Sequence, residues 1–149
     1  MNLLCREIAF GSPLYHITVE LRKRVLRTPL GLDWEPDAFA GEEKSFHIGV
    51  FSEEHELLGC LILKPLGTTE LKMRQVAIEP GRQGQGVGGR LLAFSEEFAK
   101  TKGYRRISAH ARETALTFYQ RHGYDVSGEM FLELTVPHFA IAKSLAEGA

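Results

Sequence analysis

Five glycines stand within nine residues, Gly81 to Gly89, between an apolar run and a segment with helical spacing. Glycine costs a helix about 1 kcal/mol per position relative to alanine, so several glycines at a helix start need an explanation. One explanation is that the backbone approaches a ligand more closely than a Cβ atom would allow. A helix start also presents unpaired N–H groups and the positive end of the helix dipole. We therefore predict that this loop binds phosphate, with Arg82 as an added cation.

Two common phosphate motifs fit this segment incompletely. The P-loop pattern fails because Arg90 and Leu91 stand where a lysine and a hydroxyl are needed. The dinucleotide pattern G-x-G-x-x-G matches at Gly84, Gly86 and Gly89. The acidic residue expected near the end of the next strand is missing, however. A nucleotide-dependent oxidoreductase therefore stays open as an alternative.

A third pattern covers more of the segment. The spacing Gln83-x-x-Gly86-x-Gly88, shortly after Val76–Ile78 and Pro80, resembles a pyrophosphate-binding signature. That signature belongs to the GNAT superfamily of acyl-CoA N-acyltransferases.

A downstream segment strengthens this resemblance. Residues Ala115–Tyr124 read ALTFYQRHGY, which is similar to the family's A-x-x-F-Y-x-x-x-G-[FY] segment. The interval between the two motifs also fits, and the resemblance covers about residues 46–143. Near the end of the chain, Glu129–Glu133 with Pro137 and His138 resembles an ElaA-like branch of the family.

The resemblance implies a fold and an activity. The fold is α/β (α+β), a GNAT-like mixed, mostly antiparallel central sheet of six or seven strands flanked by helices. We expect one N-acetyltransferase domain over residues 1–149. The activity is transfer of an acetyl group from acetyl-CoA, as co-substrate, to a primary amine of a small molecule or peptide. The amine attacks directly in a ternary complex, and no metal is expected. A non-catalytic acyl-CoA sensor on the same fold is the other open alternative.

The resemblance also assigns cofactor contacts. In the family, the strand before the loop splays from its neighbour and offers main-chain groups to pantetheine, which here assigns Val76, Ala77 and Ile78. A backbone N–H there can stabilise the oxyanion of the tetrahedral intermediate, a contribution of roughly 3–4 kcal/mol. The residues assigned to the pyrophosphate are Arg82, Gln83, Gly84, Gln85, Gly86, Val87, Gly88 and Gly89. We expect Gly86→Val to abolish CoA binding without unfolding the protein.

Tyr119 matches the tyrosine that often protonates the leaving thiolate in this family. A phenol has a pKa of about 10 and a thiol about 8.5, so a proton can return to sulfur in a dry site. Phe118 points about 100° away on the same helix, and we expect it to be the core residue of the pair.

The general base is less well defined by the sequence. Lys72 stands where histone-type members carry a glutamate, which argues against a histone-tail substrate. We assign His138 because the pKa of free imidazole lies near neutral pH. The other candidates are a water chain or one of Glu70, Glu129, Glu133 and His110.

Two further basic features bear on binding. Arg112 stands where many members carry an asparagine that contacts the cofactor, and its guanidinium could reach a phosphate. A basic run comprises Arg22, Lys23, Arg24 and Arg27. Such a run is usually a solvated face, but in the wall of the acceptor pocket it would favour a substrate with an acidic group.

Hydrophobic periodicity predicts the elements that hold these residues. Helices are expected over residues 14–26, 86–102 and 114–122, and a short helical turn over 34–39. Strands are expected over residues 46–51, 57–64, 72–78, 104–111, 129–135 and 138–143. This order favours α/β or α+β with a mixed sheet.

Composition excludes several classes. The 149 residues carry 18 Lys+Arg and 19 Asp+Glu, so a general nucleic-acid binder is not expected. The 44% hydrophobic share is enough for the core of one domain. The two cysteines, Cys5 and Cys60, are not enough to form a metal-binding knuckle, and we expect both to be reduced thiols. No apolar run is long enough to span a membrane, so we predict a cytoplasmic protein without a membrane partner. A homodimer is left open.

Overall fold

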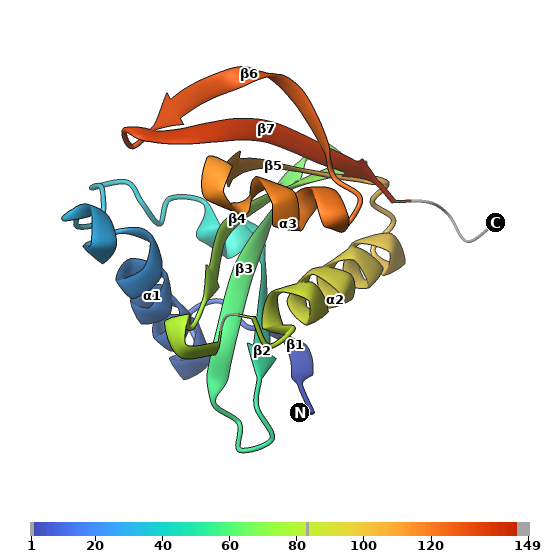
Figure 1. Ribbon diagram of the computed structural model, residues 1–149. Coiled ribbons are helices and arrows are strands. Elements are labelled where there is room, and N and C mark those ends of the chain that lie inside the picture. The colour runs from blue at the N-terminus through green and yellow to red at the C-terminus, as the bar shows by residue number, and fades with distance from the viewer. Residues whose placement is uncertain (1, 83, 146–149) are drawn as a thin grey trace.

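Seven strands form one sheet in the order β1-β2-β3-β4-β5-β7-β6. The computed structural model describes residues 2–82 and 84–145 (Figure 1). The strands are β1 (Leu4–Ile8), β2 (Phe46–Phe51), β3 (Leu57–Leu66), β4 (Glu70–Ile78), β5 (Arg106–Arg112), β6 (Asp125–Glu133) and β7 (Val136–Ser144). All neighbouring pairs are antiparallel except β4 and β5, which are parallel. The predicted mixed, mostly antiparallel sheet is therefore confirmed.

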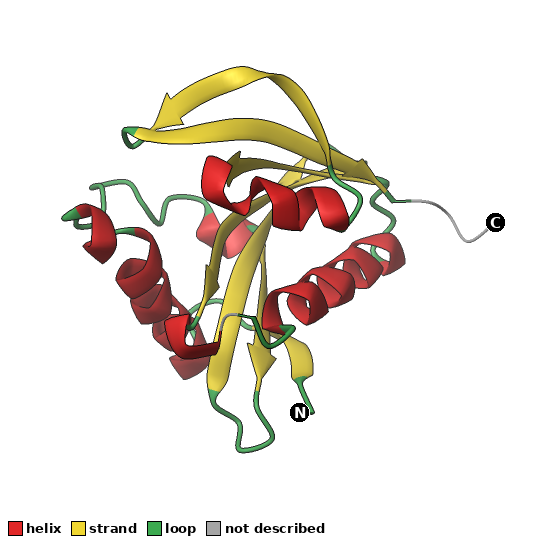
Figure 2. Ribbon diagram, in the orientation of Figure 1, coloured by secondary structure: helices red, strands yellow, loops and turns green. Residues whose placement is uncertain are grey.

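Helices cover both faces of this sheet (Figure 2). The helices are α1 (Pro13–Leu26), α2 (Val87–Thr101) and α3 (Leu116–Arg121), with the 3-10 turns η1 (Thr28–Leu30), η2 (Glu42–Lys44), η3 (Pro80–Arg82) and η4 (Glu113–Ala115). The side chain of Ser12 caps the start of α1 by accepting the Tyr15 N–H, and Pro13 occupies the first turn. Because α1 packs on one face and α2 with α3 on the other, the central strands are buried on both sides.

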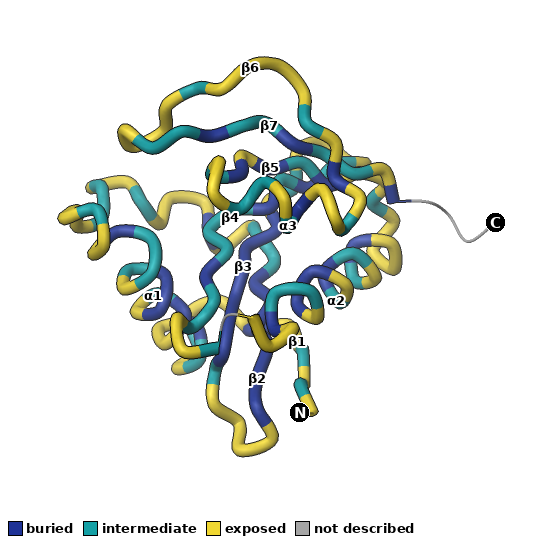
Figure 3. The backbone as a smooth tube through the Cα atoms, viewed as in Figure 1, coloured by how far each residue is buried: buried dark blue, intermediate teal, exposed yellow. Residues whose placement is uncertain are grey.

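Burial follows the strand alternation. On β3, Leu61 and Leu63 join the main core under α2, whereas Cys60 joins a smaller cluster with Leu21 of α1. The tube in Figure 3 is dark along most of β2 and β3 but largely yellow along β6. The outer strand β6 is therefore an exposed edge of the sheet.

The sheet opens between β4 and β5. Their parallel pairing runs from Glu70 opposite Arg106 to Met73 opposite Ala109. Beyond these residues both strands continue, β4 to Ile78 and β5 to Arg112, without pairing to each other. From Arg74 onward, the main-chain groups of β4 that face β5 have no ladder partner. The predicted splay before the glycine loop is present.

A β-bulge at Gln75 accompanies this opening. Ile62 of β3 pairs with Arg74, but Cys60 pairs with Ala77, so β4 carries one extra residue between the two pairs. Gln75 lies in this bulge with φ 55°. The bulge shifts the alternation by one residue, so that Val76 packs toward the main core and Ala77 toward α1.

Several predicted elements differ from those observed. Strand β1 was not predicted, because its sequence shows little alternation and most of its residues are exposed. Residues 34–39 form turns rather than a helical turn, and the helix expected over 114–122 begins as η4 before α3. Strand β6 begins at Asp125, four residues earlier than expected. No helix among the described residues is both long and apolar enough to cross a membrane.

Candidate active site

A groove of about 660 Å³ lies where the sheet opens. Its wall includes the end of α1, the unpaired part of β4, the start of α2, and α3. The predicted cofactor residues in its wall are Val76, Ile78, Arg82, Gly84, Gly86, Val87, Gly88, Gly89 and Arg112. Tyr119 also lines it. Residues predicted from two separate motifs therefore meet in one groove.

Two of the described residues predicted to bind the cofactor, Ala77 and Gln85, do not line this groove. The side chain of Ala77 is buried in the cluster with Leu21 and Cys60 on the α1 side. Gln85 is exposed outside the groove wall. Gln83 lies outside the described residues. Ala77 can therefore contribute only through its backbone, since the bulge turns its side chain away.

The loop glycines serve two different purposes. Gly84 and Gly86 have φ values of 81° and 80°, a region that residues with a side chain rarely adopt. Gly88 lies against α3, where a Cβ atom would come within 3.2 Å of the Phe118 ring. Gly89 likewise faces His122, at 3.1 Å from Nε2. Two glycines thus shape the turn, and two allow α2 and α3 to pack closely.

The start of α2 presents free amides to the groove. Gly86 is the N-cap residue and has no side chain to satisfy them. Because the first helical hydrogen bond runs from the Arg90 N–H to the Gly86 carbonyl, the amides of Val87, Gly88 and Gly89 have no intrahelical acceptor. Arg82 adds a guanidinium, which also pairs with Glu56 at 3.7 Å. This end of the groove is chemically suited to an anion such as pyrophosphate.

Tyr119 stands where the groove meets a second cavity of about 160 Å³. Its side chain is 7% exposed, and burial raises the pKa of the phenol to about 12. No described residue forms a hydrogen bond with the Tyr119 hydroxyl, and its oxygen is accessible from the adjoining space. The phenol therefore stays protonated near neutral pH with its donor available. Phe118, the expected core residue, is the more exposed of the pair and lines the groove instead.

The second cavity has His138 in its wall. The His138 side chain is 7% exposed, and its Nδ1 lies 2.8 Å from the Val136 carbonyl oxygen. A carbonyl only accepts, so Nδ1 carries the proton and Nε2 of the neutral ring holds a lone pair. His138 can therefore accept a proton in the cavity that Tyr119 also lines.

Glu133 lies between two imidazoles. Its carboxylate contacts His110 Nδ1 at 2.9 Å and His138 Nε2 at 3.5 Å. Burial acts to raise the pKa of Glu133, but the hydrogen bond with His110 and the charges of His138 and Lys72 hold it below the usual value. The Val136 carbonyl orients the His138 ring through Nδ1, and the Glu133 carboxylate can stabilise the ring once Nε2 is protonated.

The remaining base candidates lie elsewhere. Glu70 binds Ser108 and Arg106 at the paired end of β4, and Glu129 is exposed on β6. Neither lines the groove or the second cavity. The structure thus brings together His138, His110 and Glu133, and separates them from the other two.

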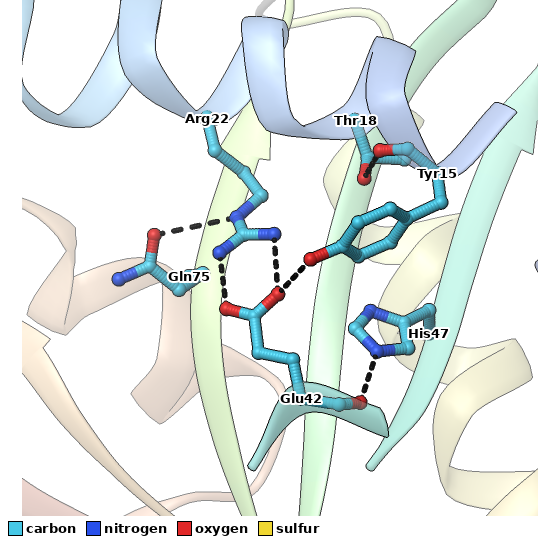
Figure 4. Close-up of polar contacts among 6 residues, drawn as sticks. All are labelled: Tyr15, Thr18, Arg22, Glu42, His47 and Gln75. Carbon is cyan, nitrogen blue, oxygen red and sulfur yellow. Dashed lines mark hydrogen bonds and ion pairs between the residues drawn. The ribbon is translucent and has the colours of Figure 1, made fainter. Parts of the chain in front are cut away.

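The basic run at α1 is only partly a solvated face: Lys23 and Arg24 have exposed side chains, whereas Arg22 and Arg27 are buried. Arg22 is 1% exposed and binds Glu42 through two hydrogen bonds, at 3.1 and 2.6 Å (Figure 4). Tyr15 also donates to Glu42, and Arg22 Nε donates to the Gln75 side chain at 3.4 Å. Arg27 is buried as well and lines the second cavity. The sequence could not reveal this, because Glu42 lies 20 residues from Arg22.

The pocket residues that were not identified from the sequence include Arg74 and Gln75, which line the second cavity, and Leu26 at the end of α1. For Arg74 and Gln75 the only available signal was their position before the predicted pantetheine residues. Arg112 lines the groove, and its Nη2 donates to the Leu26 carbonyl at 3.1 Å; its contact with the cofactor stays a prediction.

Comparison with known proteins defines the class. The acetyltransferase (GNAT) domain profile matches residues 44–126. The chain therefore belongs to the GNAT acetyltransferase family, and the predicted class, an acetyl-CoA-dependent acyltransferase, is confirmed. The Bacillus subtilis (strain 168) protein YyaT is 30% identical over 105 residues, which cover 70% of each chain.

Solved structures share the whole fold. A crystal structure described as an N-acetyltransferase from Lactobacillus plantarum is 22% identical with a TM-score of 0.86, covering 98% of this chain and 100% of that one. A GNAT acetyltransferase from Elizabethkingia anophelis with acetyl-CoA bound is 18% identical with a TM-score of 0.75, covering 97% and 99%. Escherichia coli ElaA is 16% identical with a TM-score of 0.80, covering 95% and 99%. The similarity to ElaA is one of fold, and the ElaA-like branch stays a prediction.

Among residues 2–82 and 84–145, no group of three or more histidine, cysteine or acidic residues is arranged to hold a metal ion.

Proposed function

We propose that this enzyme transfers the acetyl group of acetyl-CoA to the primary amine of a small molecule or peptide. One observation carries the proposal: the unpaired length of β4 and the free amides of α2 line a single groove that ends at Tyr119. An amide-rich arm with a diphosphate matches both surfaces. The similar structure from Elizabethkingia anophelis contains bound acetyl-CoA, which supports the same ligand here.

The chemistry divides between the two cavities. The amine enters from the second cavity and gives up its proton to His138 Nε2, and Glu133 then stabilises the protonated ring. Its nitrogen then forms a bond to the thioester carbonyl carbon. A free backbone N–H of β4 between Arg74 and Ile78 stabilises the oxyanion. As the carbon–sulfur bond breaks, Tyr119 supplies a proton to sulfur, and the second proton lost by the amine nitrogen returns to the Tyr119 phenolate oxygen. The products are an N-acetyl amide and CoA.

The first test is a thermal-shift panel of acetyl-CoA, CoA, NADH and ATP. A ligand at 100 times its Kd stabilises the folded state by about 2.7 kcal/mol, which gives a clear rise in Tm. We expect acetyl-CoA and CoA to raise Tm and NADH to leave it unchanged. A shift with NADH alone would support the oxidoreductase alternative and overturn the proposal.

The second test is turnover of an amine library, followed by free-thiol detection. Burial raises the pKa of Cys60 to about 12 and also raises that of Cys5, so the enzyme's own thiols react slowly with the reagent. Release of CoA that requires an amine supports catalysis. Tight acetyl-CoA binding without turnover of any amine would favour the sensor alternative.

A further inference from the structure

The second cavity is rich in guanidinium groups. Arg27, Arg74 and Arg112 all line it, whereas Glu133 is the one carboxylate in its wall among the described residues. An adjoining cavity of about 300 Å³ adds Lys72 and one further carboxylate, Glu35. An amine acceptor arrives as a cation, so a pocket built for an amine alone would be expected to carry the opposite charge. The excess of positive charge needs another explanation.

Two of these arginines converge on one oxygen. Arg27 Nη1 and Arg112 Nη2 both donate to the Leu26 carbonyl, at 3.3 and 3.1 Å. Arg27 also has a carboxylate partner, because its Nε binds Glu35 at 3.1 Å. Arg112 has no carboxylate partner among the described residues. Burial and the charge of Arg27 lower the pKa of Arg112, and the Glu133 carboxylate offsets this only in part, so an anion bound to Arg112 would stabilise its charge.

Arg74 has fewer polar partners than Arg112. It is half-buried on β4, next to the bulge residue Gln75, and lines both the second and the adjoining cavity. Within residues 2–82 and 84–145, its guanidinium makes no hydrogen bond or ion pair. A guanidinium offers a planar fork that matches a carboxylate through two parallel hydrogen bonds. Arg74 is therefore free to bind an anionic ligand at the opening of the sheet.

We propose that the amine acceptor also carries a carboxylate, which Arg74 and Arg112 bind in the cavity beside Tyr119. This inference rests on the proposed acetyltransferase function. Glu133 and His138 lie in the same cavity and receive the amine end, so the wall complements both charges of an amino acid. A cavity of about 160 Å³ fits a small acceptor of this kind.

Matched acceptors test the inference. Each of several amino acids is compared with its carboxamide and with its decarboxylated amine, for example phenylalanine, phenylalaninamide and phenethylamine. We expect kcat/KM to be at least about tenfold higher for the acid than for both neutral partners, since charge-assisted hydrogen bonds would be lost. The amide has a less basic amine than the acid, and the decarboxylated amine does not, so amine basicity cannot explain a preference over both. A neutral partner used equally well would overturn the inference.

A variant locates the effect. Arg74→Gln should raise KM for the acid by about tenfold or more while leaving KM for phenethylamine and the Kd of acetyl-CoA unchanged. Arg74→Lys keeps the positive charge but lacks the planar fork, so its KM for the acid should lie between that of the native enzyme and that of Arg74→Gln. Arg121→Gln removes an exposed arginine of α3 outside both cavities and is the matched control. An equal rise in KM for the acid and for phenethylamine in Arg74→Gln would overturn the assignment of Arg74 to the carboxylate.

The outcomes separate the inference from the function on which it rests. If acetyl-CoA fails to raise Tm, the proposed function fails. If acetyl-CoA binds and neutral amines are acetylated without a preference for acids, only the carboxylate inference fails. Acetyl-CoA binding with no turnover of any acid in the panel also overturns that inference.

Discussion

The guanidinium of Arg22 and the carboxylate of Glu42 form a two-fold hydrogen-bonded ion pair, with side chains only 1% and 4% exposed. The same guanidinium reaches Gln75 in the β4 bulge, and the same carboxylate accepts from Tyr15 (Figure 4). This network ties α1 and η2 to the strand segment where the sheet opens. The ion pair therefore supports the wall of the second cavity through Gln75.

Removing one partner of this pair should cost much stability. Glu42→Gln leaves the buried Arg22 charge without its counter-charge, so we expect the free energy of unfolding to fall by about 3–5 kcal/mol. Urea denaturation measures the change. Glu43→Gln alters the exposed neighbouring glutamate in the same way and should change stability by less than about 0.5 kcal/mol. Equal losses in the two variants would contradict a structural role for the pair.

The bulge residue itself gives a second prediction. Gln75 has φ 55°, which costs a non-glycine residue about 1–2 kcal/mol. Both Gln75→Ala and Gln75→Gly remove the hydrogen bond from Arg22, but only glycine also relieves the backbone. We therefore expect the glycine variant to be more stable than the alanine variant by about 1 kcal/mol.

The exposed helical residue Gln120 is the matched control for this comparison. In α3 the order should reverse, because glycine is about 1 kcal/mol less favourable than alanine inside a helix. Denaturation of all four variants checks both signs. The same order at both positions would contradict the strain assigned to Gln75.

The sequence predicted best what depends on local periodicity. Helix α2 was expected over residues 86–102 and is found at Val87–Thr101, because its apolar residues recur every three and four positions. Strand β2 was expected with the bounds it has, Phe46–Phe51. The two family motifs also placed the glycine loop and Tyr119, which the structure brings to the same groove.

What the sequence could not predict depends on contacts between distant residues. The bulge at Gln75 has no local signal, since a glutamine with positive φ looks like any other strand residue. The Arg22–Glu42 pair joins residues that periodicity places on a helix and in a loop. The hairpin between β6 and β7 turns at Leu134 and Thr135, whose φ values of 52° and 63° are normally signalled by glycine or asparagine.

The loop glycine Gly86 provides a third prediction. Gly86→Val should lose affinity for acetyl-CoA, as expected from the sequence, but the φ of 80° adds a cost in stability. We expect the free energy of unfolding without ligand to fall by about 1–2 kcal/mol. Gly81→Val places the same side chain at a position with open space and no positive φ, and should change stability by less than about 0.5 kcal/mol. Denaturation without ligand and titration with acetyl-CoA separate the two effects, and unchanged affinity in Gly86→Val would refute the role of this loop.

Tyr119→Phe tests the proposed acid. Because no described residue binds the hydroxyl, its removal should leave stability and the Kd of acetyl-CoA nearly unchanged. Loss of a general acid should lower kcat by about 100-fold or more. Steady-state kinetics with any accepted amine measures this. Tyr104→Phe, a half-buried tyrosine that lines neither the groove nor the second cavity, is the control, and a full kcat in Tyr119→Phe would contradict the assignment.

The same variant should alter stability in alkaline solution. Burial raises the pKa of Tyr119 to about 12, whereas an unfolded tyrosine titrates near pH 10. Between these values the unfolded chain binds fewer protons than the folded one, so stability falls as pH rises, by at most about 1.4 kcal/mol per pH unit for this group. Tyr119→Phe removes this contribution. Above pH 10, the stability of the variant should therefore decline less steeply than that of the native protein. Below pH 10, the two proteins should show the same pH dependence. Urea denaturation between about pH 9 and 11.5 measures both slopes. A Tyr119→Phe slope equal to the native slope would mean that burial does not hold the phenol protonated.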